Sequence, residues 1–231
     1  IKDSHRLRGQ YQEELARLEE QAMEGFDMVV LALDRTLEAV ANQDVELAQI
    51  VMENDDQIDG RYLEVHQGLI TLLATQSPVA TDLRVIAALL HVMKNLERMG
   101  DQCVNIAKLI PLTGHEPPVD ERMIQHIVAM GKQARIEVAQ AKRAFLDRDV
   151  PMARNLVVLD EEVDSQNRQC FALAIEIGDE PDRREWAMTM LLAARALERI
   201  GDNAVDVGEQ VVFVVTGLFR EFQDSASVEA P

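Results

Sequence analysis

One twelve-residue string occurs twice in this chain of 231 residues. It reads LERMGDQCVNIA from Leu96 and LERIGDNAVDVG from Leu197, an offset of 101 residues. Both copies keep an acid, a glycine and a second acid at the same places. An internal repeat of this kind predicts two copies of one structural unit.

The repeat extends upstream of the two strings. The segment NQDVELAQIVMENDDQID (42–59) matches DRDVPMARNLVVLDEEVD (147–164) at an offset of 105. Because the later strings match at 101, a four-residue difference must fall between Asp59 and Leu96. We expect it at the turn formed by ATQSPVATD in the first half and EIGDEPDRRE in the second, since insertions belong in loops.

Apolar residues around each string follow a helical period. Their spacing alternates between four and three, which predicts one apolar stripe along a helix of about seven turns. The two stripes consist of Val85, Leu89, Val92, Leu96, Met99, Cys103, Ile106 and Ile110, and of Trp186, Met190, Ala193, Leu197, Ile200, Ala204, Val207 and Val211. Shorter stripes precede them, with Leu47, Val51, Ile58, Val65, Leu69 and Leu72, and with Leu156, Leu159, Val163, Cys170 and Phe171.

The fold predicted from these stripes is all-α. We expect two tandem three-helix bundles, with six long helices in total, related by the internal repeat. Their expected bounds are residues 1–112 and 113–222, with PLTGHEPP as the linker and a flexible tail at 223–231. Asp44, Ser77 and Asp149 are candidate helix N-caps.

Charge and composition exclude several classes of partner. The formal net charge of -18 disfavours nucleic acid and anionic lipid, because the surface repels phosphate groups. The longest late apolar run, VVFVVTGLF, is far shorter than the ~20 residues that a membrane span needs. Cys103 and Cys170 lack metal-ligand spacing, so we expect buried thiols in a reducing compartment. These features predict a cytoplasmic protein without membrane insertion.

The acids of the repeat fall into matching pairs. Four residues separate the members of each pair, so both carboxylates lie on one helix face. The pairs are Asp55 with Asp59, Glu97 with Asp101, Asp160 with Asp164, and Glu198 with Asp202. If each half folds as a hairpin about its turn, its two pairs come level to within one helical turn.

Four carboxylates that meet across a helix groove suit hard or borderline cations. Fe, Zn, Mn, Mg and Ca all fit such an oxygen-rich site, and the sequence does not choose among them. The alternative is that the acids form a solvated surface of a metal-free helical scaffold. Gly100 and Gly201, between the acids, are expected to permit close approach of helices.

With these motifs the sequence resembles the PhoU family of phosphate-uptake regulators. The resemblance is carried by QSPVATDLRVIAALL (76–90), by the two LER strings and by DEEVD (160–164). It implies tandem three-helix bundles that bind metal through E/D-x-x-x-D motifs at the four acid pairs. The second half has GDEPDRREW in place of the QSPVATDLR form, which leaves equal metal binding by both halves open.

The resemblance also implies a role. Proteins of this family act as cytoplasmic adaptors between the ATPase subunit of the phosphate ABC transporter and the phosphate-sensing histidine kinase, and they restrain uptake and starvation signalling. The resemblance therefore predicts a negative regulator, recruited by its partners to the inner face of the membrane. Amphipathic helices can also pair with a second copy, and we expect a homodimer.

The main alternative function is a carboxylate-bridged metalloenzyme. A di-iron design expects Glu-x-x-His on two helices, and this sequence has no such motif. It also lacks a GxxxxGK[ST] phosphate loop and a G-x-S-x-G elbow. We therefore expect a protein that is not an enzyme, with no catalytic residues.

Overall fold

The computed structural model describes residues 2–75, 78–113 and 118–222, and the predicted tail at 223–231 lies outside them. Within these ranges the chain forms six α-helices and one short 3₁₀ helix, and no strand. The helices are α1 (Lys2–Asn42), α2 (Val45–Thr75), α3 (Ala80–Leu109), η1 (Ile110–Leu112), α4 (Glu121–Asp147), α5 (Val150–Gly178) and α6 (Pro181–Thr216). The predicted all-α class is confirmed.

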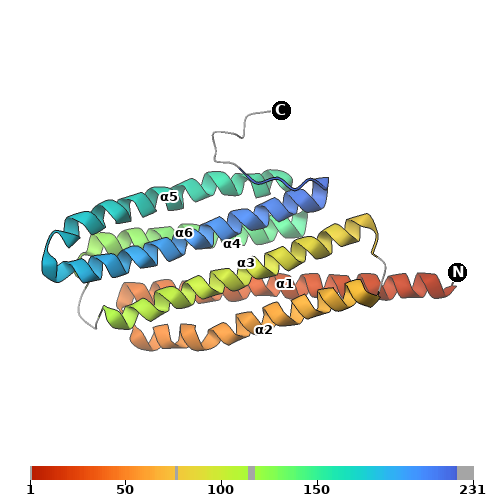
Figure 1. The fold of residues 1–231 in the computed structure, drawn as a ribbon, viewed down its shortest axis with the longest axis horizontal. Coiled ribbons are helices and arrows are strands. Elements are labelled where there is room, and N and C mark those ends of the chain that lie inside the picture. Colours follow the sequence, from red (N-terminus) through yellow and green to blue (C-terminus); the bar gives the residue numbers. More distant parts are fainter. Residues whose placement is uncertain (1, 76–77, 114–117, 223–231) are drawn as a thin grey trace.

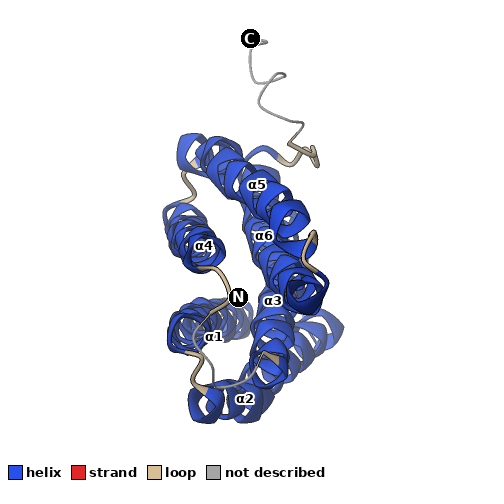
Figure 2. Cartoon of the chain, turned by 90° about the vertical axis from the view of Figure 1, so that its left-hand side faces the viewer, coloured by secondary structure: helices blue, strands red, loops and turns tan. Residues whose placement is uncertain are grey.

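The helices form two three-helix bundles that lie side by side along their lengths (Figure 1). Helix α1 packs on α2 and α3 in the first half, and α4 packs on α5 and α6 in the second. The halves meet through equivalent helices, because α3 packs on α6 and α1 packs on α4 (Figure 2). Helices α2 and α5 therefore lie at the two outer ends of the molecule.

The apolar stripes predicted from the sequence form the core. Every residue of the two long stripes is buried, the first on α3 with Ile110 of η1 and the second on α6. In the shorter stripes Leu47 and Leu159 are only partly buried. Phe171 on α5 differs from expectation, since its side chain is 56% exposed. Its neighbour Cys170 already occupies the inward position, and a step of about 100° around the helix carries Phe171 off the buried stripe.

Short turns join the helices of each half. Asp44 accepts a hydrogen bond from the Leu47 backbone N–H at 2.8 Å, and Asp149 accepts one from Met152 at 2.8 Å, as expected of N-caps. Ser77 lies outside the described residues, and α3 begins after Val79 without a side-chain cap. The four-residue difference falls where it was expected: α2 is two residues longer than α5, and the connection that follows is also two residues longer.

Ion pairs cross between α1 and α4. Arg135 Nε lies 2.6 Å from Asp34 Oδ1, and Lys142 Nζ lies 2.7 Å from Asp27 Oδ1. Both acidic residues belong to α1 and both basic residues belong to α4, so opposite charges face each other between the two halves. In the part of the chain that the structure describes, no helix combines the length and the apolar character that crossing a bilayer requires.

Candidate functional site

The first acidic cluster lies between α2 and α3. The pKa of Asp55 is raised to about 6, first by burial and then by the negative charges of Asp59 and Asp101. The pKa of Asp101 is also raised, by desolvation and by the charges of Glu97 and Asp59. The four acids therefore act on one another, as the hairpin arrangement predicts.

The members of this first cluster differ in exposure. Asp55 and Glu97 are half-buried, whereas Asp59 and Asp101 are exposed. Lys94, one turn before Glu97, lies 2.6 Å from its Oε2 and partly neutralises it. The cluster is thus an open group of carboxylates at the surface, with Asp55 as its innermost member.

The second acidic cluster occupies the matching place between α5 and α6. Burial and the charges of Asp202 and Asp164 raise the pKa of Asp160 to about 7. The pKa of Asp202 is raised by desolvation and by Asp164. Glu198 differs from these three because it forms an ion pair with Arg195 on its own helix. Asp160, Asp164 and Asp202 are therefore the acids that interact most directly.

The two glycines allow these carboxylates to approach the neighbouring helix. A Cβ at Gly201 would lie 2.3 Å from Asp160 Oδ1, a distance at which atoms collide. A Cβ at Gly100 would lie 3.1 Å from Asp55 Oδ1, the equivalent contact in the first half. In each half, then, the inner Asp of one helix packs directly on the glycine of the next, as expected from the sequence.

Sequence reasoning missed one acid of the second cluster, Glu137 on α4. Its side chain is completely buried, and its pKa is raised to about 9 by burial and by the charges of Asp160 and Asp164. A signal was present, because Glu137 continues the four-and-three spacing of buried Met130 and Ala134. A lone carboxylate within an apolar stripe indicates a buried polar contact.

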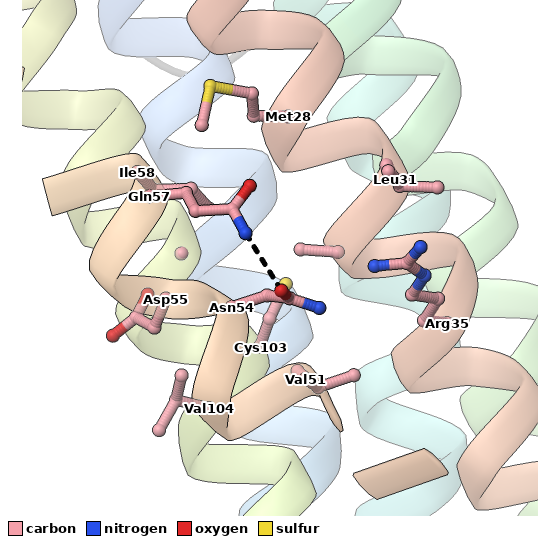
Figure 3. Close-up of a pocket in the computed structure, with 12 residues that line it drawn as sticks. Met28, Leu31, Arg35, Val51, Asn54, Asp55, Gln57, Ile58, Cys103 and Val104 are labelled. Carbon is pink, nitrogen blue, oxygen red and sulfur yellow. Dashed lines mark hydrogen bonds between the residues drawn. The ribbon is translucent and has the colours of Figure 1, made fainter. Parts of the chain in front are cut away.

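A small cavity occupies the corresponding place in the first half. Its volume is about 60 Å³, and Ala32, Asp55, Gly100 and Cys103 are among the residues that line it. Figure 3 shows the side chains of Asp55 and Cys103 around this space. The Cys103 thiol is fully buried, which raises its pKa to about 12, so it is not a thiolate ligand at neutral pH.

The chemistry of the second cluster fits a cation. Glu137 Oε2 and Asp160 Oδ1 are buried, and among the described residues no N–H group or hydroxyl donates to either oxygen. The two carboxyl groups share a hydrogen bond, in which protonated Glu137 donates to Asp160. Within that same part of the chain, no three Asp, Glu, His or Cys side chains are already arranged around one point as metal ligands. The cluster supplies carboxylate oxygens, but these side chains would have to change rotamer to point at one common ion.

A separate polar groove of about 620 Å³ lies between the halves. His91 and Arg98 of α3 line it together with Asp206 and Glu209 of α6. Burial raises the pKa of Glu209 to about 7, and its Oε1 accepts a hydrogen bond from the backbone N–H of Phe222. Acidic and basic side chains line this groove together, so their charges offset one another. The groove therefore lacks the excess of positive charge that would select anions.

Comparison with known proteins identifies the family of the fold. The PhoU domain matches residues 23–110 and 127–211, one copy in each half. The "Phosphate-specific transport system accessory protein PhoU homolog" of Clostridium acetobutylicum is 29% identical over 216 residues, 93% of this chain and 98% of that protein.

Two crystal structures have the same architecture. PhoU from Pseudomonas aeruginosa superposes with a TM-score of 0.83 at 27% identity, over 90% of this chain and all of that one. The "phosphate transport system regulatory protein PhoU" from Streptococcus pneumoniae gives a TM-score of 0.81 at 25% identity, over 92% of this chain and all of that one. The chain therefore belongs to the PhoU family, with one PhoU domain in each half.

Proposed function

We propose that this protein is a negative regulator of phosphate uptake and of phosphate-starvation signalling. It acts as a cytoplasmic adaptor between the ATPase subunit of the phosphate transporter and the phosphate-sensing histidine kinase. The observation that carries this proposal is the match of both halves to PhoU domains along nearly the whole length of relatives named as accessory or regulatory proteins of phosphate transport.

The surface supports contacts with protein partners. Each half exposes large apolar side chains on its outer helix: Leu63 and Ile70 on α2, and Phe171 and Ile175 on α5. Members of each pair are seven or four residues apart, so they share one helix face. Exposed apolar groups of this kind suit contacts with proteins. The molecule thus offers two separated faces for the ATPase, the kinase or a second copy in a homodimer, and such contacts would hold it at the inner face of the membrane.

Binding of metal ions at the two acidic clusters is part of this proposal. The first site would use Asp55, Asp59, Glu97 and Asp101, and the second would use Asp160, Asp164, Glu198 and Asp202. A bound divalent cation would supply positive charge that offsets repulsion among the carboxylates and favours close packing of the two helices that carry them. The residues themselves orient the oxygens, and the glycines leave the space in which the helices approach.

The regulatory role is tested in a strain from which the gene has been deleted. We expect starvation-induced genes to be expressed in rich phosphate after deletion and to be repressed again when the intact chain is restored. Copies carrying Leu63→Asp with Ile70→Asp, or Phe171→Asp with Ile175→Asp, should lose repression together with co-purification of the ATPase or the kinase. Normal repression in the deletion strain would contradict the proposal.

The metal sites are tested by elemental analysis of chelator-free protein. We expect stoichiometric Fe, Zn, Mn, Mg or Ca that decreases in the Glu97→Ala/Asp101→Ala and Glu198→Ala/Asp202→Ala variants. Protein that contains no metal and takes up none in titration would identify a metal-free scaffold. The regulatory role would then stand on the reporter experiment alone.

A further inference from the structure

The chain changes direction directly after the last helix. Helix α6 ends at Thr216, and Gly217 follows with a φ of 76°, a left-handed conformation that glycine adopts without strain. We call the six residues from this glycine, GLFREF (217–222), the strap. Phe219, Glu221 and Phe222 of the strap line the polar groove between the two halves. The strap therefore forms one wall of that groove.

Both halves of the molecule hold the strap. The ring of Phe219 lies 6.4 Å from the ring of His91 on α3 and 5.8 Å from that of Phe213 on α6, measured between centroids. The backbone N–H of Phe222 donates a hydrogen bond to Glu209 Oε1 on α6. The strap thus bridges the first half and the second half at the place where α3 and α6 meet.

The internal repeat shows that the bundle itself does not require the strap's acceptor. Glu209 is buried, whereas the equivalent residue of the first half is Lys108, which is exposed. Burial of a carboxyl group is unfavourable unless a donor bonds to it, and the Phe222 N–H is that donor. Since a lysine suffices at this position in the first half, Glu209 is explained by the strap and not by helix packing.

The strap is attached by few contacts. The side chains of Leu218 and Phe219 are 54% and 58% exposed. Among the described residues, the bond from Phe222 to Glu209 is the one hydrogen bond between residues 219–222 and the helices. Segments with so few buried contacts open at a small cost in free energy. The strap can therefore leave its place while the helices stay folded.

The strap also shows which chemistry its place on α3 and α6 accepts. Two phenylalanines, three residues apart, make the ring contacts and the hydrogen bond. Arg220 and Glu221 lie between them and offset each other in charge. A segment without net charge suits a groove whose acidic and basic side chains also offset one another.

We propose that the strap is an autoinhibitory element. It occupies a binding place on α3 and α6 within its own chain, and when it opens, this place binds a segment of a protein partner that carries two aromatic side chains three residues apart. The inference goes beyond the adaptor role proposed above, because it names a surface between the halves and a segment that covers it. It does not depend on metal binding.

The test uses the full-length chain in two forms, wild type and a variant with Phe219→Ala and Phe222→Ala, whose strap is released. The probe is a capped peptide of sequence GLFREF, titrated to about 5 mM because a tethered segment competes at an effective concentration in the millimolar range. Nuclear magnetic resonance shifts of the His91 and Phe213 amides report binding. We expect the released variant to bind roughly tenfold more tightly, as it should if the strap covers nine wild-type molecules in ten.

Matched variants test the acceptor. In the released variant, Glu209→Met should weaken peptide binding roughly tenfold, because it removes the acceptor of the Phe222 N–H. Lys108→Met, at the equivalent position of the first half, should leave the affinity unchanged. A peptide with alanine in place of both phenylalanines should not bind. Circular dichroism establishes that each variant folds.

Hydrogen exchange of the wild-type protein tests the opening itself. The Phe222 amide should exchange many-fold faster than the amide of Val211, which lies in the buried stripe of α6. Equal protection of these two amides would show that the strap stays closed and would overturn the proposal.

The remaining outcomes also decide the matter. No peptide binding to the released variant, or equal affinity for both forms, would overturn the proposal. If the wild type is a dimer in solution and the released variant a monomer, the strap occupies a second copy of the chain, and inhibition within one chain is wrong. None of these results bears on the reporter or metal experiments, so the two sets of proposals fail separately.

Discussion

The two acidic clusters have the same motifs in the same places, yet they differ in how far the protein removes them from water. The pKa of the inner acid is about 6 at Asp55 and about 7 at Asp160. The pKa of Glu137, which has no counterpart in the first half, is about 9. Deeper burial and the charges of Asp202 and Asp164 raise the pKa of Asp160, whereas its hydrogen bond with Glu137 lowers it.

The first helix of each half supplies Ala32 in one case and Glu137 in the other. The repeated acid pairs therefore do not determine the properties of each cluster by themselves. Residues outside the pairs, such as Ala32 and Glu137, also determine how polar its surroundings are and how many carboxyl groups it contains.

The equivalence of the two halves is tested most strongly in the core. Leu96 and Leu197 begin the repeated strings, and both are fully buried. We expect Leu96→Ala and Leu197→Ala each to lower the free energy of unfolding by about 2–5 kcal/mol, because each leaves a cavity in a packed stripe. Urea denaturation monitored by circular dichroism measures both. A large loss for one variant and none for the other would break the comparison between the halves.

The pH dependence of stability should reveal Glu137 in the metal-free protein. Its pKa is about 9 in the folded state and about 4.5 in the unfolded chain, so between these values the folded state binds more protons. The free energy of unfolding contributed by this group therefore falls as pH rises from about 4.5 to about 9. Asp55 gives the same sign, but its contribution ends near its folded pKa of about 6.

Substitution isolates this contribution of Glu137. At pH 8 in chelator, Glu137→Met should stabilise the protein by roughly 1–3 kcal/mol, since it replaces a buried carboxyl group by an apolar side chain. The variant should also lose most of the fall in stability between pH 7 and pH 9. Denaturation curves of both proteins, measured between pH 7 and pH 9, test this expectation. If the free energy of unfolding falls equally in variant and parent, Glu137 is not the group responsible.

The paired glycines should respond unequally to a methyl group. At Gly201 the added Cβ collides with Asp160 and lies 3.0 Å from Glu137 Oε2, whereas at Gly100 its nearest contacts are 3.1 Å away. We expect Gly201→Ala to cost about 1–2 kcal/mol. Gly100→Ala should be close to neutral, because the gain in helix propensity of about 1 kcal/mol offsets a mild contact. Thermal unfolding compares the two, and equal losses would show that both halves are packed to the same tightness.

The smallest effects are expected at the ion pairs between the halves. Asp34 and Arg135 are both 44% exposed, so Asp34→Ala should change stability by less than about 0.5 kcal/mol. Glu19 is 24% exposed beside Arg148 at 28%, and Glu19→Ala should cost more, up to about 1 kcal/mol. Melting curves at low and high salt test this order. A loss above 2 kcal/mol at Asp34 would mean that charge, and not apolar packing, joins the halves.

Much of this fold could be predicted because the repeat and the apolar spacing carry the same information twice. The long stripes on α3 and α6, the caps at Asp44 and Asp149 and the position of the four-residue difference all follow from local pattern. The pairing of Asp55 with Asp101 across a groove also followed, since a hairpin fixes the heights of residues on its two arms.

The remainder depended on three-dimensional packing. Phe171 was predicted as part of the apolar stripe, but one step of about 100° around the helix from Cys170 exposes it. Glu137 is not part of a repeated acid pair, because the equivalent position in the first half is Ala32. Its interaction with Asp160 joins α4 to α5 and is visible only once those helices are placed.

The pairing of equivalent helices between the halves, α3 with α6 and α1 with α4, has the form of an isologous interface. In such an interface the same surface is used on both sides, as in a twofold dimer of identical subunits. Here one polypeptide supplies both sides. Because the two sides are encoded separately, a substitution such as Ala to Glu at the 32/137 position alters one side only, whereas in a true homodimer it would appear twice. Covalent fusion of the two domains thus permits asymmetry within a symmetric framework.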